Sequence, residues 1–129
     1  MKKKILIVIA DYYQNIAKGL LNSSLSLIPK DSSVKIINVP GVFEIPVTIS
    51  KNIKKYDAFL ALGCVIKGKT PHFDFISQAS TNAIMDLSIH SRKPIGNGII
   101  TCLSMKQAII RKKKGAEAAK AVISVLSQK

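Results

Sequence analysis

The sequence has few of the residues that build metal centres and disulfide frameworks. Among its 129 residues there are two cysteines, two histidines and no tryptophan. Cys64 and Cys102 both lie within apolar stretches, so we expect two buried thiols rather than a disulfide framework. Neither residue type recurs at the spacing of zinc ligands, and the sequence therefore predicts no structural metal site.

No apolar run is long enough to cross a membrane. The longest one extends from Ile5 to Ala10 and ends at Asp11, whereas a membrane helix needs about 18 apolar residues. The segment Met1 to Lys4 contains three lysines before this run, which imitates the start of a secretory signal. The apolar run is too short for such a signal, however, and no small-residue cleavage site follows it. We expect a cytoplasmic protein.

Acidic residues are scarce, with 7 Asp and Glu against 20 Lys and Arg, which gives a net charge of +13. Such a charge attracts phosphorylated substrates and, without sequence preference, nucleic acid. The lysines are dispersed along the sequence, only Arg92 and Arg111 are arginines, and aromatic residues make up 5%. A solvated lysine surface is the ordinary explanation of this charge, and a basic RNA-associated module stays open as an alternative.

What is present is the composition of one globular domain. Hydrophobic residues make up 47% and charged residues 21%, and no repeat or low-complexity linker divides the chain. We expect a single domain over residues 1–129. Buried-strand patterns alternate with helical ones, which predicts four strands, at Lys4–Ala10, Val34–Val39, Asp57–Ile66 and Pro94–Thr101. Helical segments are predicted at Asn15–Ile28, Phe43–Ile53, Phe73–Ile89 and Met105–Leu126, the last as one helix or a pair of helices with a kink at Gly115.

This alternation predicts an α/β fold, a three-layer α/β/α sandwich around a four-stranded parallel sheet, because parallel neighbours need crossover connections. Ligands of such sheets bind outside the carboxyl ends of the strands. The loops at those ends, where we expect the chemistry, are Asp11–Asn15, Pro40–Pro46, Lys67–His72 and the residues after Thr101.

Several residues in these loops suit chemistry, and each also has a structural interpretation. The loop Lys67–Thr70 precedes a helix, where it binds a phosphate or forms a turn with an N-cap. It is not a Walker loop, because the first glycine of that motif is absent. His72 lies where an imidazole can exchange protons with a ligand, whereas His90 is expected on the surface at a helix end. Glu44 binds substrate hydroxyls or stabilises a helix N-terminus.

Two further features have the same double interpretation. Tyr12 and Tyr13 follow the first strand, where they stack on a planar heterocycle or pack against the protein. The run Arg111 to Lys114 is the densest cluster of positive charge, and it binds a phosphate or solvates a helix end.

Four motifs together resemble a known family. They are Pro40-Gly-Val-Phe-Glu-Ile-Pro46, Gly63-Cys-Val-Ile-Lys-Gly-Lys-Thr-Pro-His-Phe-Asp74, Gln107-Ala-Ile-Ile-Arg111 and Lys114-Gly-Ala-Glu117. Their order and spacing are similar to those of the 6,7-dimethyl-8-ribityllumazine synthases of riboflavin biosynthesis, over nearly the whole chain. The resemblance implies a flavodoxin-like sandwich assembled as a homopentamer, and in some members as a decamer or icosahedral shell.

The resemblance also implies a reaction without cofactor or metal. 5-Amino-6-ribitylaminouracil condenses with 3,4-dihydroxy-2-butanone 4-phosphate to give the lumazine, phosphate and water. It implies His72 as the catalytic proton carrier, and it implies substrate contacts within one subunit through Tyr12, Val42, Phe43, Glu44, Val65, Ile66, Gly68, Lys69 and Thr70. It implies contacts from a neighbouring subunit through Arg111 and the position of Asn97. It also implies that Lys114 and Glu117 lie near the phosphate and the histidine, with Glu117 in support of His72.

This sequence departs from the family at a few of these positions. Tyr12 replaces a phenylalanine or tryptophan, Asp11 stands where arginine is frequent, and Tyr13 where asparagine is frequent. Asn97 stands where many members have a phenylalanine, and the segment after Arg111 is shorter. A second enzymatic alternative is the archaeal type of riboflavin synthase, which resembles the family in length and fold but acts on two lumazine molecules. No membrane or specific nucleic-acid partner is expected.

Overall fold

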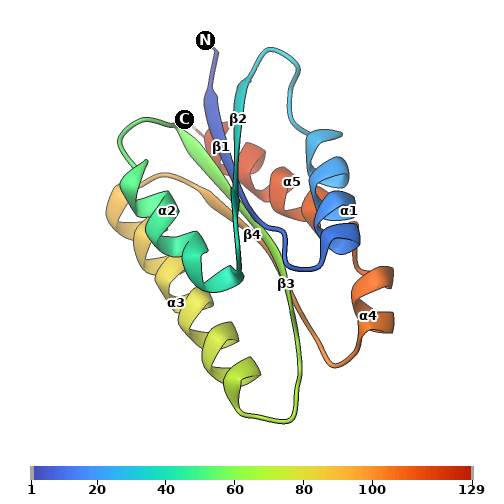
Figure 1. Cartoon of the computed structure of the whole chain (residues 1–129). Helices are drawn as coiled ribbons and strands as arrows, with labels where there is room; N and C mark the ends of the chain where they lie inside the picture. The colour runs from blue at the N-terminus through green and yellow to red at the C-terminus, as the bar shows by residue number, and fades with distance from the viewer. Residues whose placement is uncertain (1, 129) are drawn as a thin grey trace.

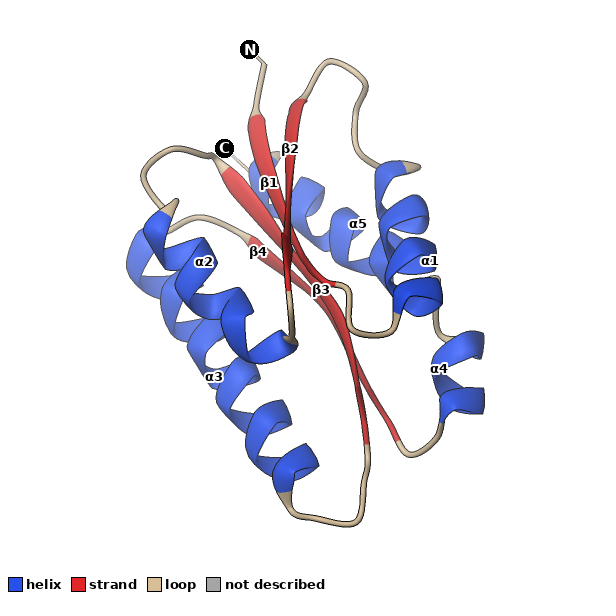
Figure 2. Ribbon diagram, viewed as in Figure 1, coloured by secondary structure: helices blue, strands red, loops and turns tan. Residues whose placement is uncertain are grey.

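The computed structural model describes residues 2–128, so that Met1 and Lys129, which the expected domain includes, lie outside the described residues. Its centre is a four-stranded parallel sheet in the order β2-β1-β3-β4 (Figure 2). The strands are β1 (Lys4–Ala10), β2 (Ser33–Val39), β3 (Ala58–Ile66) and β4 (Ile95–Cys102). Each is within two residues of its predicted bounds.

Helices cover both faces of this sheet. On one face lie α1 (Gln14–Leu25) and α5 (Lys114–Leu126), and on the other lie α2 (Ile45–Lys51) and α3 (His72–Ser91) (Figure 1). The short helix α4 (Met105–Ile110) follows β4 beyond the end of the sheet. The predicted three-layer α/β/α sandwich is therefore confirmed.

The central strands read as continuous apolar runs because both of their faces are buried. Alternate residues of β1 face opposite layers: Ile5, Ile7 and Ile9 pack with α1 and α5, whereas Leu6 and Val8 pack with α2 and α3. Among the described residues, no helix is both long enough and apolar enough to cross a membrane.

The second predicted helix begins later than expected. Val42–Glu44 forms a 3-10 turn, and α2 starts only at Ile45, with Pro46 in its first turn. A proline is tolerated there because the first amides of a helix have no partner within the helix. The turn keeps Phe43 and Glu44 outside the helix, next to the carboxyl ends of the strands.

Gly115 is not the kink that the sequence predicts. The chain breaks between α4 and α5 at residues 111–113, and Gly115 lies in the first turn of α5. A Cβ at this position would clash with the carbonyl oxygen of Leu20 and the hydroxyl of Ser23 on α1. The glycine therefore allows α5 to approach α1 closely, and its role is packing rather than bending.

We expect Gly115→Ala to destabilise the protein by about 1–3 kcal/mol, because the added methyl group has to displace the backbone of α1. Equilibrium unfolding in urea measures the change. Gly68→Ala is the matched control, since a Cβ there meets nothing within 4 Å. Equal stability of the two variants would contradict this account of the α1–α5 contact.

Candidate active site

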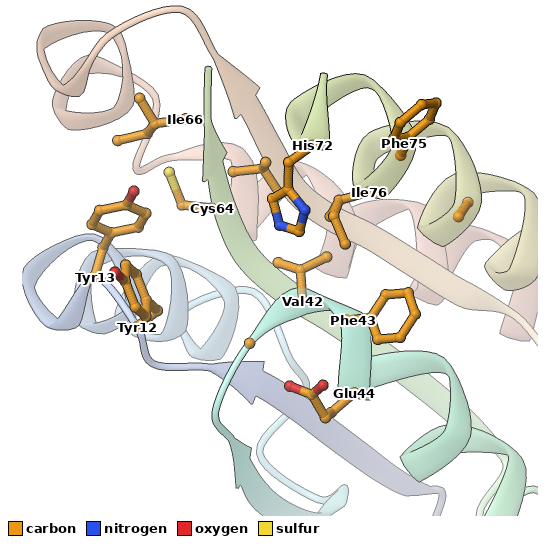
Figure 3. Close-up of a pocket in the computed structure, with 13 residues that line it drawn as sticks. Tyr12, Tyr13, Val42, Phe43, Glu44, Cys64, Ile66, His72, Phe75 and Ile76 are labelled. Atoms are coloured by element: carbon orange, nitrogen blue, oxygen red, sulfur yellow. The ribbon is translucent and has the colours of Figure 1, made fainter. Parts of the chain in front are cut away.

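A cavity of about 790 Å³ opens at the carboxyl ends of the strands, where ligands of parallel sheets bind. Three segments far apart in the sequence build it: the end of β1, the turn after β2, and the end of β3 with the start of α3 (Figure 3). It is lined by Tyr12, Tyr13, Gly41, Val42, Phe43, Glu44, Cys64, Val65, Ile66, His72, Phe75, Ile76 and Ala79. The structure thus brings together most of the residues that the sequence predicts for one subunit.

The first wall is formed by two tyrosines that follow β1. Tyr13 is half-buried and packs against the α1–α5 core, and burial raises the pKa of its hydroxyl, so that it stays neutral. Tyr12 contacts Tyr13 edge to face, with ring centroids 4.9 Å apart and an interplanar angle of 85°. The Tyr12 side chain is 75% exposed, which leaves one face of its ring free for a planar ligand.

The second wall is the 3-10 turn after β2. Gly63 on β3 lets this turn approach the sheet, because a Cβ there would meet the Val42 side chain at 2.9 Å. Val42 is buried as a result, and the Phe43 side chain next to it is 68% exposed. Glu44 ends the turn half-buried at the cavity and is the one carboxylate among the lining residues.

The third wall contains the histidine. His72 begins α3, and its imidazole points toward Val42 across the cavity (Figure 3). Its backbone N–H donates to Oγ1 of Thr70 at 3.4 Å, which ties the preceding loop to the start of the helix. Gly68, Lys69 and Thr70 are exposed and do not line the cavity within one chain.

Cys64 is one of the buried residues of the wall formed by β3, and burial opposes the ionisation of its thiol. Burial, with smaller contributions from Cys102, raises the pKa of Cys64 to about 12. Only the thiolate is nucleophilic, so the group is inert near neutral pH. Both cysteines are free thiols, as the sequence predicts.

Native Cys64 should therefore react slowly with iodoacetamide. At pH 8 its thiolate fraction lies on the order of a thousandfold below that of a thiol with a pKa of 9.0. The raised pKa of Cys64 contributes to the free energy of unfolding, and this contribution is complete below pH 9. It is lost as the pH rises toward 12, because the thiol ionises at a lower pH in the unfolded state than in the native state. The rate at which iodoacetamide alkylates Cys64 is measured in the Cys102→Ala variant, in the native state and in denaturant. Equal rates in the two states would contradict the raised pKa of the native thiol.

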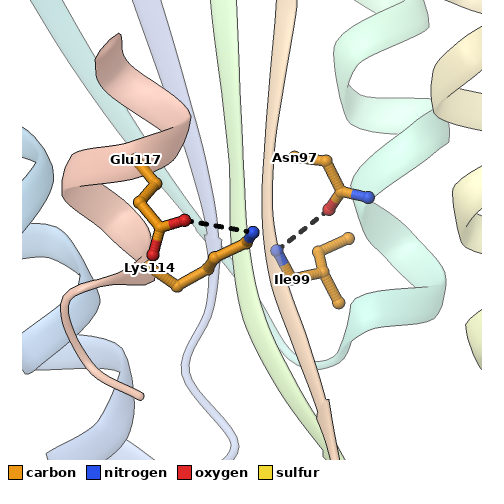
Figure 4. Close-up of polar contacts among 4 residues, drawn as sticks. All are labelled: Asn97, Ile99, Lys114 and Glu117. Atoms are coloured by element: carbon orange, nitrogen blue, oxygen red, sulfur yellow. Dashed lines mark hydrogen bonds and ion pairs between the residues drawn. The ribbon is translucent and has the colours of Figure 1, made fainter. Parts of the chain in front are cut away.

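Three residues that the resemblance places at the phosphate or near His72 lie at a second cavity, of about 460 Å³, at the free edge of β4. Arg111, Lys114 and Glu117 line it, and no residue lines both cavities. Nζ of Lys114 lies 3.6 Å from Oε1 of Glu117 (Figure 4). Nη1 of Arg111 donates to the carbonyl oxygen of Thr101 at 3.3 Å, which holds the guanidinium near the end of β4.

A capping arrangement fixes this second group of residues. The hydroxyl of Ser104 accepts a hydrogen bond from the backbone of Gln107, whose side chain accepts one from the backbone of Leu103. Such reciprocal bonds define the start of a helix. They set the direction of α4 and thereby the place of Arg111 at its end.

Asn97 lies apart from both cavities. Its side-chain oxygen accepts a hydrogen bond from the backbone of Ile99 at 3.0 Å, on the face of the sheet opposite Lys114 and Glu117 (Figure 4). Its side chain is thus engaged within its own strand. Within one chain, the predicted site therefore divides into a group around His72 and a group around Arg111.

Sequence reasoning did not name Phe75, Ile76 and Ala79 as parts of the site. A helical spacing could have identified them, because residues three, four and seven positions after His72 share its face of α3. Cys64 was expected to be buried, but its position at the cavity was not recognised.

The fold and the site define a class: a parallel α/β protein with a ligand cavity at the strand ends that holds one imidazole and one carboxylate. Comparison with known proteins identifies the family. The model of the 6,7-dimethyl-8-ribityllumazine synthase family matches residues 2–129. The chain belongs to this family.

Curated relatives carry the same name. The lumazine synthase of Bartonella tribocorum is 41% identical over 140 residues, which cover 100% of this chain and 93% of the relative. That of Methylobacterium radiotolerans is 42% identical over 98% of this chain and 82% of its own length. That of Cutibacterium acnes is 39% identical over 96% of this chain and 80% of its own length.

Proposed function

We propose that this protein is a 6,7-dimethyl-8-ribityllumazine synthase, a transferase of riboflavin biosynthesis. It condenses 5-amino-6-ribitylaminouracil with 3,4-dihydroxy-2-butanone 4-phosphate. Membership of the family carries this assignment. Neither the archaeal type of riboflavin synthase nor an RNA-associated module is favoured by a family match that covers nearly the whole chain.

The chemistry needs proton transfer at several carbons and little else from the protein. The amine of the pyrimidine attacks the ketone, and loss of water gives an imine. Phosphate then leaves, and ring closure with loss of a second water completes the lumazine. His72 is the proposed proton carrier, because it is the one imidazole at the cavity. Positioning of two substrates in one cavity supplies much of the remaining rate enhancement.

The pyrimidine is proposed to bind against the first and second walls. Tyr12 stacks on the ring, supported edge-on by Tyr13. Val42 and Phe43 surround the ligand, and Glu44 accepts hydrogen bonds from the ribityl hydroxyls. The backbone of Val65 and Ile66, at the end of β3, is proposed to bind the polar edge of the ring; this set is supported by the lining of the cavity.

The phosphate is proposed to bind at the loop before α3, between two subunits. Gly68, Lys69 and Thr70 supply backbone amides, a charge and a hydroxyl, and they are exposed and accessible to an anion. Arg111 of a neighbouring subunit and Lys114 supply charge-assisted contacts, and Glu117 supports His72. Asn97, whose amide oxygen is bound within its own strand, is not included among the proposed contacts.

A homo-oligomer, a pentamer on the family pattern, follows from this arrangement. The observation that supports it is the division of the predicted residues between two cavities of one chain. The large exposure of Tyr12 and Phe43 and the free edge of β4 offer surfaces that a second copy would cover. A cytoplasmic location is also part of the proposal, and two free thiols agree with a reducing compartment.

Incubation of the purified protein with both substrates tests the function. We expect a lumazine chromophore and release of one phosphate for each lumazine formed. Incubation with lumazine alone is the control, and riboflavin in that sample would identify a riboflavin synthase instead. No product from folded protein in either mixture would contradict the proposal.

A further inference from the structure

The amino ends of the strands carry charged residues that the proposed reaction does not use. In a parallel sheet all strands begin at one edge, which here lies opposite the candidate site. The segments that lead into the strands meet at this edge, near the chain ends in Figure 1. We name it the amino edge, and its basic residues are Lys2, Lys3, Lys4, Lys30, Lys54, Lys55, Arg92 and Lys93.

Few carboxylates oppose this charge. Asp31 and Asp57 are the acidic residues on the same segments, and Asp57 accepts a hydrogen bond from the backbone of Lys4 at 2.8 Å. The amino edge thus has a net charge of +6. Within residues 2–128, the one ion pair is that of Lys114 with Glu117, at the opposite end of the sheet.

The carboxyl edge is less charged, although the site there binds phosphate in the proposed reaction. Its basic residues are Lys67, Lys69, Lys106, Arg111, Lys112, Lys113 and Lys114, and its acidic residues are Asp11, Glu44, Asp74 and Glu117. The carboxyl edge therefore has a net charge of +3, half the net charge of the amino edge. The two edges carry similar numbers of basic residues, and the larger net charge of the amino edge arises mainly because fewer carboxylates lie there.

We propose that the amino edge binds the phosphate backbone of duplex nucleic acid without sequence preference. Four strands about 4.8 Å apart and two helical layers about 10 Å from the sheet give this edge a width of roughly 15–20 Å. Duplex DNA presents a phosphate charge about every 1.7 Å along its axis, and duplex RNA has at least a similar charge density, so several phosphates fit across the edge at once. The amino edge would thus recognise the regular array of phosphate charges on a duplex.

The side chains of the amino edge favour a duplex over single strands and membranes. Single-stranded RNA is bound by exposed aromatic side chains, but Tyr56 beside this edge packs half-buried against Phe59. Bilayer surfaces are bound by several exposed apolar side chains together with basic ones. On the described segments before the strands, Leu27 is the only large apolar residue that is exposed, and Leu25, Ile89 and Val125 are exposed near the ends of α1, α3 and α5. Binding to anionic vesicles is therefore the competing outcome of the test.

Fluorescence anisotropy with a labelled 20-base-pair RNA duplex tests this proposal on the full-length protein. The variant Lys30→Gln/Lys54→Gln/Lys55→Gln removes three charges from the amino edge. The control Lys18→Gln/Lys106→Gln/Lys120→Gln removes three exposed charges elsewhere, so both variants have the same net charge. Lumazine formation should be unchanged in both, so failure of this proposal is separate from failure of the proposed function.

We expect the affinity of the amino-edge variant for the duplex to fall at least tenfold. The magnitude of the slope of log K against log salt should decrease by roughly 2–3, since each lost phosphate contact lowers that magnitude by about 0.9. The control variant should keep most of the wild-type slope. Equal losses in the two variants would show that binding follows net charge alone and would overturn the proposal. Weak RNA binding with strong binding to phosphatidylserine vesicles would also overturn it.

Discussion

His72→Ala should lower kcat for lumazine formation by a factor of about 10² to 10⁴, the usual contribution of a positioned general acid or base. The side chain is exposed at the first turn of α3, so its removal leaves no cavity in the core. The change should appear mainly in kcat, because the substrates are bound by other residues. Absorbance of the lumazine product under steady-state conditions measures both constants.

His90→Ala is the matched control. His90 is the other histidine of the chain, is exposed near the end of α3, and contacts the backbone carbonyl of Asp86 through Nδ1 at 2.7 Å. It does not line the cavity, and we expect activity close to that of the wild type. Full activity of the His72 variant, or equal losses in both variants, would refute the assignment of the proton carrier.

Arg111→Ala should lower kcat/KM by about 10- to 100-fold, chiefly through a higher KM for the phosphorylated substrate. A hydrogen bond to a charged group contributes about 1.5–3 kcal/mol. The guanidinium is exposed and its one internal partner is the carbonyl of Thr101, so the fold should not depend on it. KM values measured separately for the two substrates distinguish the phosphate contact from a general defect.

Lys106→Ala controls for the loss of one positive charge near the same cavity. Lys106 lies on α4, is exposed, and does not line the cavity that holds Arg111. We expect little change in either KM. An unchanged KM for the phosphorylated substrate in the Arg111 variant would remove this residue from the proposed site, whatever the oligomeric state.

Much of the fold follows from local patterns. The apolar run that forms β1 has the predicted bounds, because a strand buried on both faces excludes polar residues along its whole length. The start of α2 was less predictable, since the pattern from Phe43 onward is helical but Pro46 and the 3-10 turn delay the helix. Gly115 was misread because its purpose, the close approach of α1, is a tertiary contact.

The site was predictable where the topology determines it. Parallel strands end at one edge, and so Tyr12, Glu44 and His72 had to meet there. The place of Arg111 relative to His72 could not be derived in this way, because it depends on how two chains meet. The net positive charge of the amino edge also required the fold, since Lys30 and Lys54 lie far apart in the sequence.

If one active site is built from two chains, a mixing experiment shows it most directly. His72→Ala and Arg111→Ala would be purified separately, dissociated, combined in equal amounts and reassembled. If each site takes His72 from one subunit and Arg111 from its neighbour, about one quarter of the sites in the mixture contain both intact residues. With the phosphorylated substrate well below its wild-type KM, where both variants are slow, we expect activity to rise from the low level of either variant toward one quarter of that of the wild type. Activity that stays at the level of the separate variants would contradict a shared site.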